Sequence, residues 1–416
     1  MNFRKTTLSI FQKQILIMFK GALIAQIIGF LGTLVLAKLY GESAYGIFGV
    51  FISFSGFFSI LNTFQLEQCL VITNHKGERK NLFNSLFLIT LISSLIVAFF
   101  VFVISFFFQN QTDKFFIILL SILFSIASSF NKIHEYYLTF KENFKKISEI
   151  KVLTIAFNLA LQLILFQQFK LKGLVYGNLI SIILISIYYF TINKPSFSSI
   201  NSSLLKKTLI NNKTIVVHVL PATLISSVAI NILPILITLY FGLEVYGVYF
   251  LSWKILSTPF FLINSSVAQV YYKKANNLLT KNSSELFETT KKIVYSNIGL
   301  MLFFLILINT IGIYFLELFL NKSWENLKTY TLILSFLILA KSAFIPISDI
   351  IIVLKKNHMH LIFNCYLFII NFFGFYIGHL YNSINISLIL ITFFGCIGYL
   401  SLLFYSLKEI KKVACK

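Results

Sequence analysis

The chain has 416 residues, of which 57% are hydrophobic and 12% are charged, and its mean hydropathy is +0.85. Such a composition is typical of an integral membrane protein, and apolar runs follow one another so closely that no segment remains for a soluble catalytic domain. The formal net charge of +21 is distributed over the segments between these runs, which argues against a nucleic-acid-binding patch and indicates membrane topology instead.

Hydropathy predicts about twelve membrane-spanning helices along the chain. Their centres lie near residues 27, 58, 96, 127, 159, 182, 227, 259, 303, 341, 369 and 395. The first apolar run, from about Ile15 to Leu39, lacks a small-residue cleavage site, so we interpret it as an uncleaved span and not as a signal peptide. We therefore predict an all-α integral membrane protein.

The basic residues predict the orientation of these spans. If the N-terminus is cytoplasmic, most lysines fall in cytoplasmic segments, among them the loop "NHKGERKN" (residues 74–81) and the C-terminal end. The outer segments then hold only Lys38, Lys114, Lys170, Lys172, Lys322 and Lys328. Because cytoplasmic loops of membrane proteins are enriched in lysine and arginine, both termini are predicted to lie in the cytoplasm.

A polar connection and a short repeat divide the chain into halves. The connection "NKPSFSSINSSLLKKTLINNK" (residues 193–213) indicates a cytoplasmic linker at 196–213 between an N-terminal lobe (1–195) and a C-terminal lobe (214–416). "GESAYGIFGVF" from Gly41 and "GLEVYGVYFLS" from Gly242 both place Tyr-Gly four residues after a glycine. A chance match is the alternative. The repeat predicts two six-helix lobes with pseudo-twofold symmetry along the membrane normal and a binding site in the cleft between them.

Three predicted spans have polar residues along one helical face, which predicts a hydrated central cavity. Serine and threonine more often join helices in membranes, so that role remains open for each of them. For Lys132, an ion pair with Glu135 three residues later is the expected role. The polar positions are Ser55, Ser59, Asn62 and Thr63 in span 2, Ser121, Ser125, Ser128, Lys132 and Glu135 in span 4, and Lys254, Ser257, Thr258, Ser265 and Gln269 in span 8.

The charges inside the spans predict what a cavity would bind. Lys254 and Lys341 lie too far from the ends of their spans to reach the surface easily, whereas Lys20 could serve either the cavity or the cytoplasmic surface. Deep cationic charge favours an anion such as phosphate or diphosphate. Four further polar residues are candidates for substrate binding: His218, Ser257, Asn62 and Gln269. A histidine at the start of a span, such as His218, is more often interfacial. Two acidic residues, Asp349 and Glu67, are candidates for a proton or sodium site.

The segment "LAKLYGESAYGIFGVFISFSGFFSILNTFQLEQCLVI" (residues 36–72) resembles the MOP exporter superfamily, in particular its O-antigen (Wzx-type) polysaccharide flippases. It has a span that ends in Leu-Tyr-Gly, the Tyr-Gly pair, and a span with an Asn-Thr break before a polar end. The resemblance implies two lobes that move a polyprenyl-diphosphate-linked oligosaccharide to the outer leaflet by alternating access, without hydrolysing ATP. By residue type and depth, Lys20, Lys254 and Lys341 match the cationic cavity residues of such flippases. The chain has no arginine in a span and lacks two extra C-terminal spans typical of lipid II flippases.

Two other functions compete with this interpretation. A multidrug exporter of the same superfamily would be expected to have cavity acids for its cationic drugs. A membrane-embedded polysaccharide polymerase would need a long outer loop with catalytic Arg, His or Asp, so an enzyme is not expected. No metal or cofactor is expected either, because the cysteines lack metal-site spacing. The resemblance implies a bacterial cytoplasmic (inner) membrane location, contact with membrane lipids and, as candidate partners, a polysaccharide polymerase and a chain-length regulator.

Overall fold

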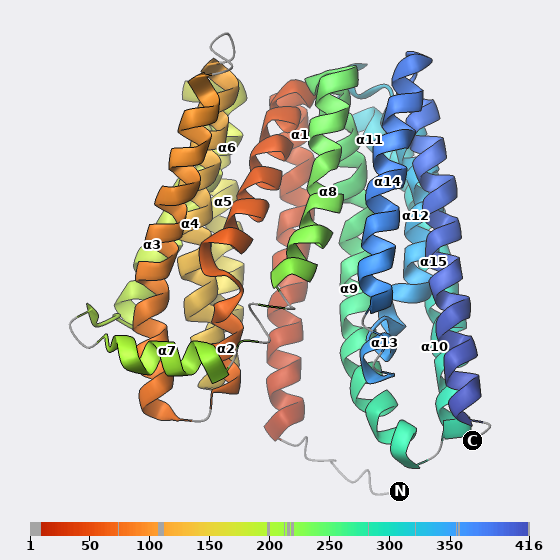
Figure 1. The fold of residues 1–416 in the computed structure, drawn as a ribbon. Coiled ribbons are helices and arrows are strands. Elements are labelled where there is room, and N and C mark those ends of the chain that lie inside the picture. Colours follow the sequence, from red (N-terminus) through yellow and green to blue (C-terminus); the bar gives the residue numbers. More distant parts are fainter. Residues whose placement is uncertain are drawn as a thin grey trace, which may run out of the picture. The chain divides into compact units, whose positions relative to one another are not determined.

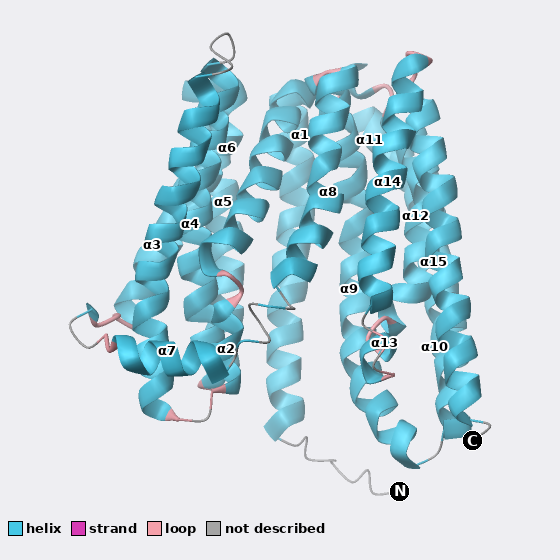
Figure 2. Ribbon diagram, in the orientation of Figure 1, coloured by secondary structure: helices cyan, strands magenta, loops and turns pink. Residues whose placement is uncertain are grey.

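The computed structural model describes residues 10–73, 75–106, 112–197, 200–211, 213, 217, 220–281, 283–320, 322–354, 356 and 358–414, and its regular structure within these ranges is helical (Figures 1 and 2). Among the described residues, a π-helical segment, Ile308–Gly312, and short 3₁₀ segments join some of the α-helices. Their bounds are α1 Ile10–Thr63, α2 Cys69–Ile72, α3 Lys76–Phe106, α4 Thr112–Phe140, α5 Phe144–Phe169, α6 Gly173–Ile192, α7 Ser202–Asn211, α8 Leu220–Phe241, α9 Leu243–Lys281, α10 Ser283–Leu307, α11 Ile313–Phe319, α12 Leu327–Phe344, α13 Ile350–Val353, α14 His358–Leu380 and α15 Ile384–Ala414.

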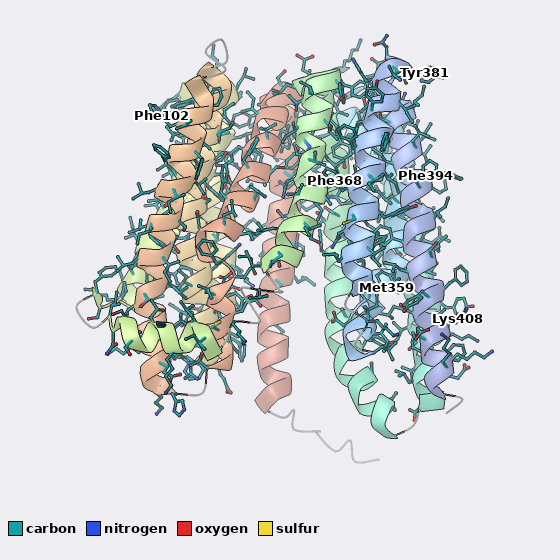
Figure 3. All side chains as sticks on the ribbon, viewed as in Figure 1. Phe102, Met359, Phe368, Tyr381, Phe394 and Lys408 are labelled. Carbon is teal, nitrogen blue, oxygen red and sulfur yellow. The ribbon has the colours of Figure 1, made fainter. Side chains whose placement is uncertain are left out.

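The helices have the length and surface of membrane spans. In the described ranges, nine helical segments are long and apolar enough to cross a membrane, and each predicted span centre lies within a helix. Helices suit this environment because all their backbone polar groups can be satisfied internally. Their outer surfaces are apolar: Phe102 and Phe394, labelled in Figure 3, are 60% and 43% exposed. The all-α membrane fold predicted from hydropathy is therefore confirmed.

The helices group into two compact units. Unit 1 comprises Met1–Leu36 and Val50–Leu224, and unit 2 comprises Ala37–Gly49 and Ile225–Lys416. The middle of α1 therefore belongs to unit 2, although the rest of that helix belongs to unit 1. Each unit has an apolar cluster of its own. In unit 1 the cluster joins α2, α3 and α4 and includes Leu70, Leu82, Phe83, Leu86, Phe87 and Ile133, and in unit 2 it includes Tyr271, Leu286, Phe344, Ile347, Leu402 and Leu403.

The region predicted as a linker contains a helix that packs on unit 1. Helix α7 places Leu205 and Leu209 against the apolar cluster of unit 1. The side chain of Asn81 holds the backbone just before α7: Asn81 Nδ2 donates to the backbone carbonyl of Asn201 at 3.0 Å, and the backbone N–H of Asn201 donates to Asn81 Oδ1 at 2.6 Å. Lys207 forms an ion pair with Glu78 at 3.2 Å. The polar connection thus has a defined place on α3.

Both repeat segments open on a glycine with a positive φ. Gly41 has φ +75° and interrupts the helical geometry of α1, and Gly242 has φ +94° and separates α8 from α9. Both angles lie in the left-handed region, which glycine adopts without the steric cost that other residues incur. The glycine that opens each repeat is therefore the residue at which the chain turns from one span into the next.

The repeats also contact each other reciprocally, within unit 2. A Cβ built on Gly46 would lie 2.1 Å from the carbonyl oxygen of Leu243, and one built on Gly247 would lie 1.9 Å from the carbonyl oxygen of Glu42. The first pair becomes the second when the halves are exchanged, since Gly46 corresponds to Gly247 and Glu42 to Leu243. Reciprocity of this kind is what a twofold axis imposes on a contact. The predicted pseudo-twofold relation between the repeats is therefore visible in their packing.

Candidate functional site

Lys341 lies between two aromatic rings inside unit 2. Its Nζ is 4.4 Å from the ring centre of Trp253 and 5.5 Å from that of Tyr399. Three helices meet here, because Lys341 is in α12, Trp253 in α9 and Tyr399 in α15. Tyr399 is only 5% exposed, and Lys341 and Trp253 are partly buried. We call these three residues the lysine cage.

The lysine cage holds a positive charge without a carboxylate. Among the side chains that the structure describes, no acidic group lies within ion-pair distance of Lys341 Nζ. Lys341 lies in the last turn of α12, closer to the end of the apolar segment Leu327–Ile347 than the sequence predicted. The cost of about 2.5–3.5 kcal/mol for a lysine at the centre of a spanning helix is therefore an upper bound here. A cation over an aromatic face gains about 0.5–2 kcal/mol, so two rings offset much of this cost. The ammonium is thus stabilised but not neutralised.

Lys254 is the other lysine of unit 2 that the sequence predicts to lie deep in a span. It lies in α9, one residue after Trp253, and is partly buried. The hydroxyls of Ser257 and Thr258 donate to its backbone carbonyl at 3.3 and 2.8 Å, respectively. Ser257 is 8% exposed, and its hydroxyl already forms a hydrogen bond within its own helix. In the described part of the chain, the Lys254 ammonium has neither an ion pair nor a hydrogen bond.

Three further candidates are placed only in part. Lys20 lies on α1 with an exposed side chain. His218 lies outside the described residues. Gln269 belongs to α9, but its side chain is outside the described set. A role for these three residues beside Lys254 and Lys341 therefore stays a prediction.

The polar faces of spans 2 and 4 meet inside unit 1. Asn62 is fully buried, and its Nδ2 donates to Ser125 Oγ at 2.9 Å. The backbone carbonyl of Asn62 accepts from Ser93 Oγ at 2.7 Å. These bonds join α1 to α4 and α3, which is the role that serine commonly has between membrane helices. Asn62 is thus placed in a helix contact and not on an exposed surface.

Lys132 has a different partner from the one expected. Its Nζ donates to Ser59 Oγ at 2.7 Å, whereas Glu135 forms an ion pair with Lys151 at 2.8 Å. Glu67, in the turn that follows α1, and Glu135 are the acidic residues whose charges act on Lys132. The carboxylate of Glu67 is 2% exposed, and its Oε2 accepts no hydrogen bond from any described residue. The expected Lys132–Glu135 pair is therefore wrong.

The other acidic candidate lies in unit 2. Asp349 is partly buried in the turn between the 3₁₀ segment Ile345–Ile347 and α13. Over the residues that the structure describes, no group of three or more His, Cys, Asp or Glu is arranged to hold a metal ion. Asp349 belongs to unit 2 and Glu67 to unit 1, and both stay candidates for an ion site.

Sequence reasoning missed Trp253 and Tyr399. Both lie in apolar runs, where aromatic residues usually serve packing, and hydropathy alone gives no reason to pair them with Lys341. One signal was available: the chain has only two tryptophans, and one of them directly precedes a lysine inside a span. The bond from Lys132 to Ser59 was missed because Glu135 lies nearer along the same helix and was expected to be the partner of Lys132.

Comparisons with known proteins agree with this architecture. A family model described as "Polysaccharide biosynthesis protein" matches residues 35–329. The chain is similar to the lipid II flippase MurJ in an inward-closed conformation, with a TM-score of 0.75, 16% identity and coverage of 96% of this chain and 90% of that chain. A search of curated proteins gives no match.

Two further solved structures share the fold. One is an inward-facing multidrug resistance MATE transporter of the MOP superfamily, with a TM-score of 0.63, 15% identity and coverage of 95% of this chain and 94% of that chain. The other is a MOP superfamily transporter from Pyrococcus furiosus, noted for the reverse polarity of its binding pocket, with a TM-score of 0.63, 15% identity and coverage of 96% of both chains. The family match extends over more than half of the sequence, so the chain belongs to the polysaccharide biosynthesis protein family, and its fold is that of the solved transporters.

Proposed function

We propose that this protein is a flippase that moves polyprenyl-diphosphate-linked oligosaccharide units, such as those of O-antigen, across the bacterial cytoplasmic membrane by alternating access. Family membership and the shared fold support a membrane transporter. The basic residues of the predicted cytoplasmic loops support an orientation with both termini inside. In this proposal a polysaccharide polymerase and a chain-length regulator act on the exported units, and membrane lipids surround the two units.

The observation that carries the proposal is the charge of Lys341. Its ammonium lies inside the span region without a carboxylate among the described side chains. An uncompensated positive charge in a medium of low dielectric attracts anions strongly and repels cations. Lys254 adds a second such charge in the same unit. A lipid diphosphate fits these groups, because an ammonium can give three hydrogen bonds to phosphate oxygens.

The same charge disfavours export of cationic drugs as the second candidate. A site for a lipophilic cation would need an acidic or neutral aromatic surface, and a fixed lysine between the rings would repel the drug. Trp253 and Tyr399 would suit a cationic ligand only if Lys341 were absent. The remaining polar candidates, Lys20, His218 and Gln269, stay in the proposal as residues that meet the sugar or phosphate.

We propose that ion coupling resides in unit 1, at Glu67 and Lys132. The Glu67 carboxylate is buried, and its Oε2 has no hydrogen-bond partner among the described residues, so it is the candidate for binding the coupling ion. The hydrogen bond from Lys132 to Ser59 joins α4 to α1. Asp349 is the alternative carboxylate, and a sodium gradient is the alternative to protons.

The test is export of the lipid-linked oligosaccharide in cells that lack the protein and carry plasmid-borne variants. Without the protein, single units should accumulate on the cytoplasmic leaflet, whereas a polymerase defect would leave single units already exported. Lys341→Met and Lys254→Met should lose export at normal expression. Lys408→Met, which removes an exposed lysine of α15, should retain it (Figure 3). Wild-type export by both of the first two variants would contradict the proposed role of the lysines.

A further inference from the structure

The lysine cage has a feature that anion binding alone does not require. A lysine that waits for a phosphate could be held by an aspartate or glutamate, but the groups that approach Lys341 Nζ are the faces of Trp253 and Tyr399 at 4.4 and 5.5 Å. Both rings come from other helices, so the cage is assembled by tertiary packing. One of the two rings is held by a further aromatic contact: Phe363 packs edge-on against Tyr399, with ring centres 4.8 Å apart.

We propose that Trp253 and Tyr399 act as an exchangeable stand-in for a counterion, which holds Lys341 in the empty protein and releases it to a phosphate group of the ligand. The proposal rests on the proposed function, because it assumes that the ligand is a lipid diphosphate. It assigns the two aromatic residues the role of positioning residues, which act on the ligand through Lys341.

The relative strength of the two interactions gives the direction of the exchange. A cation over a ring is attracted only by the quadrupole of that ring, whereas an ammonium and a phosphate oxygen form a charge-assisted hydrogen bond. The phosphate therefore displaces the rings. A carboxylate in their place would have to be separated from the lysine first, and that separation would oppose binding. The cage thus keeps the lysine in place but lets an anion take it.

Release of the ligand follows from the same comparison. After the phosphate leaves, the ammonium would face a desolvated site without a partner, which is costly. The two rings take it back, so the unliganded state is also stable. A transporter needs this property because a ligand that binds too tightly cannot leave on the other side of the membrane.

Trp253 reports on the cage directly. The chain has two tryptophans, so Trp324→Phe leaves Trp253 as the only indole. We expect the emission of Trp253 in the purified full-length variant to change saturably when polyprenyl diphosphate is added in nanodiscs, since the cation leaves the ring. Lys341→Met in the same background should abolish the change. Polyprenol without phosphate should give no response, and inorganic pyrophosphate separates the phosphate chemistry from the lipid tail.

A second set of variants tests the role of the rings by ligand affinity. Trp253→Glu gives Lys341 a permanent carboxylate and should weaken polyprenyl diphosphate binding by about tenfold or more, since a charge-assisted bond must be broken first. Trp253→Phe keeps an aromatic face and should change the affinity by no more than about threefold. Tyr399→Leu serves as an independent variant with part of the cage removed, and its emission response to ligand should remain but start from an altered baseline.

The outcomes separate the inference from the proposed function. Suppose that Lys341→Met abolishes export, but the Trp253 emission does not change on adding polyprenyl diphosphate and Trp253→Glu binds it with normal affinity. The exchange is then refuted, whereas the proposed flippase function stands. If the single-tryptophan protein responds equally to polyprenol, or responds after Lys341→Met, the exchange is refuted as well. If the wild-type protein does not bind polyprenyl diphosphate in nanodiscs, both proposals are contradicted.

Discussion

Alanine at Gly247 should destabilise unit 2, because it inserts a methyl group into the contact between the two repeats. The new Cβ would lie 1.9 Å from the carbonyl oxygen of Glu42 and 3.0 Å from the amide nitrogen of Gly46. Both are backbone atoms, so no side chain can rotate away. An ordinary carbon–oxygen contact is about 3.3–3.6 Å, which requires the two segments to separate locally by about 1.5 Å.

The cost can be estimated from the same geometry. Inserting a methyl group into a close-packed contact costs about 1–3 kcal/mol, so we expect Gly247→Ala to lower the free energy of unfolding by about 1–3 kcal/mol. Gly46→Ala should lose a similar amount, because its Cβ meets the Leu243 carbonyl oxygen at 2.1 Å. The double variant should be less destabilised than the sum, since both changes open one contact.

Thermal unfolding of the purified variants in detergent measures this effect. Gly299→Ala is the matched control, because α10 leaves open space around that position and alanine has the higher helix propensity. Its Tm should equal or exceed that of the wild type, while Gly247→Ala and Gly46→Ala should both unfold several degrees lower. If Gly247→Ala is as stable as Gly299→Ala, the close reciprocal packing of the repeats is refuted.

Three other changes test separate parts of the structure. Asn297→Ala should lower the free energy of unfolding by about 1–3 kcal/mol and therefore lower the Tm. The reason is that Asn297 Nδ2 donates to Asn264 Oδ1 and to the Ser342 carbonyl inside unit 2. An unchanged Tm would contradict that buried network. Asn81→Ala should increase proteolysis at α7 more than Glu78→Gln does, because it removes both hydrogen bonds between Asn81 and Asn201. Glu78→Gln removes only the ion pair with Lys207, which is worth at most about 1 kcal/mol because Lys207 is exposed. Equal cleavage of the two variants would contradict this attachment. Glu67→Gln should leave binding of polyprenyl diphosphate unchanged but make its transport in proteoliposomes insensitive to an imposed pH gradient, and full sensitivity in that variant would exclude Glu67 as the coupling group.

The sequence predicts the helices well because a span leaves a strong local signal. About 20 consecutive apolar residues are needed to cross a bilayer, and every predicted centre falls in a helix. The break after Asn62 and Thr63 was also foreseeable: α1 ends at Thr63, and Phe64 and Gln65 have positive φ. The repeat could also be predicted from a local signal, because Gly41 and Gly242 open both segments and glycine permits the turn found at each of them.

Contacts between helices are harder to predict from a single sequence. Periodicity tells which face of a helix a residue occupies, but not which other helix that face meets. Lys341, Trp253 and Tyr399 come from three helices, so nothing local connects them. Spacing along one helix also suggested a partner for Lys132 that instead binds Lys151. Similarly, the polarity of residues 193–213 indicated a linker, whereas the packing of α7 depends on two leucines that face α3 and α4.

Transport in proteoliposomes tests the central claim most directly. The purified protein would be reconstituted with a polyprenyl-diphosphate-linked oligosaccharide or with the same glycan attached to neutral polyprenol, and the glycan reaching the opposite leaflet would be measured by lectin binding. Recognition of the diphosphate by the lysines of unit 2 predicts that the wild type moves only the diphosphate-linked glycan and that Lys341→Met moves neither. Equal movement of the neutral analogue, or undiminished transport by Lys341→Met, would contradict it.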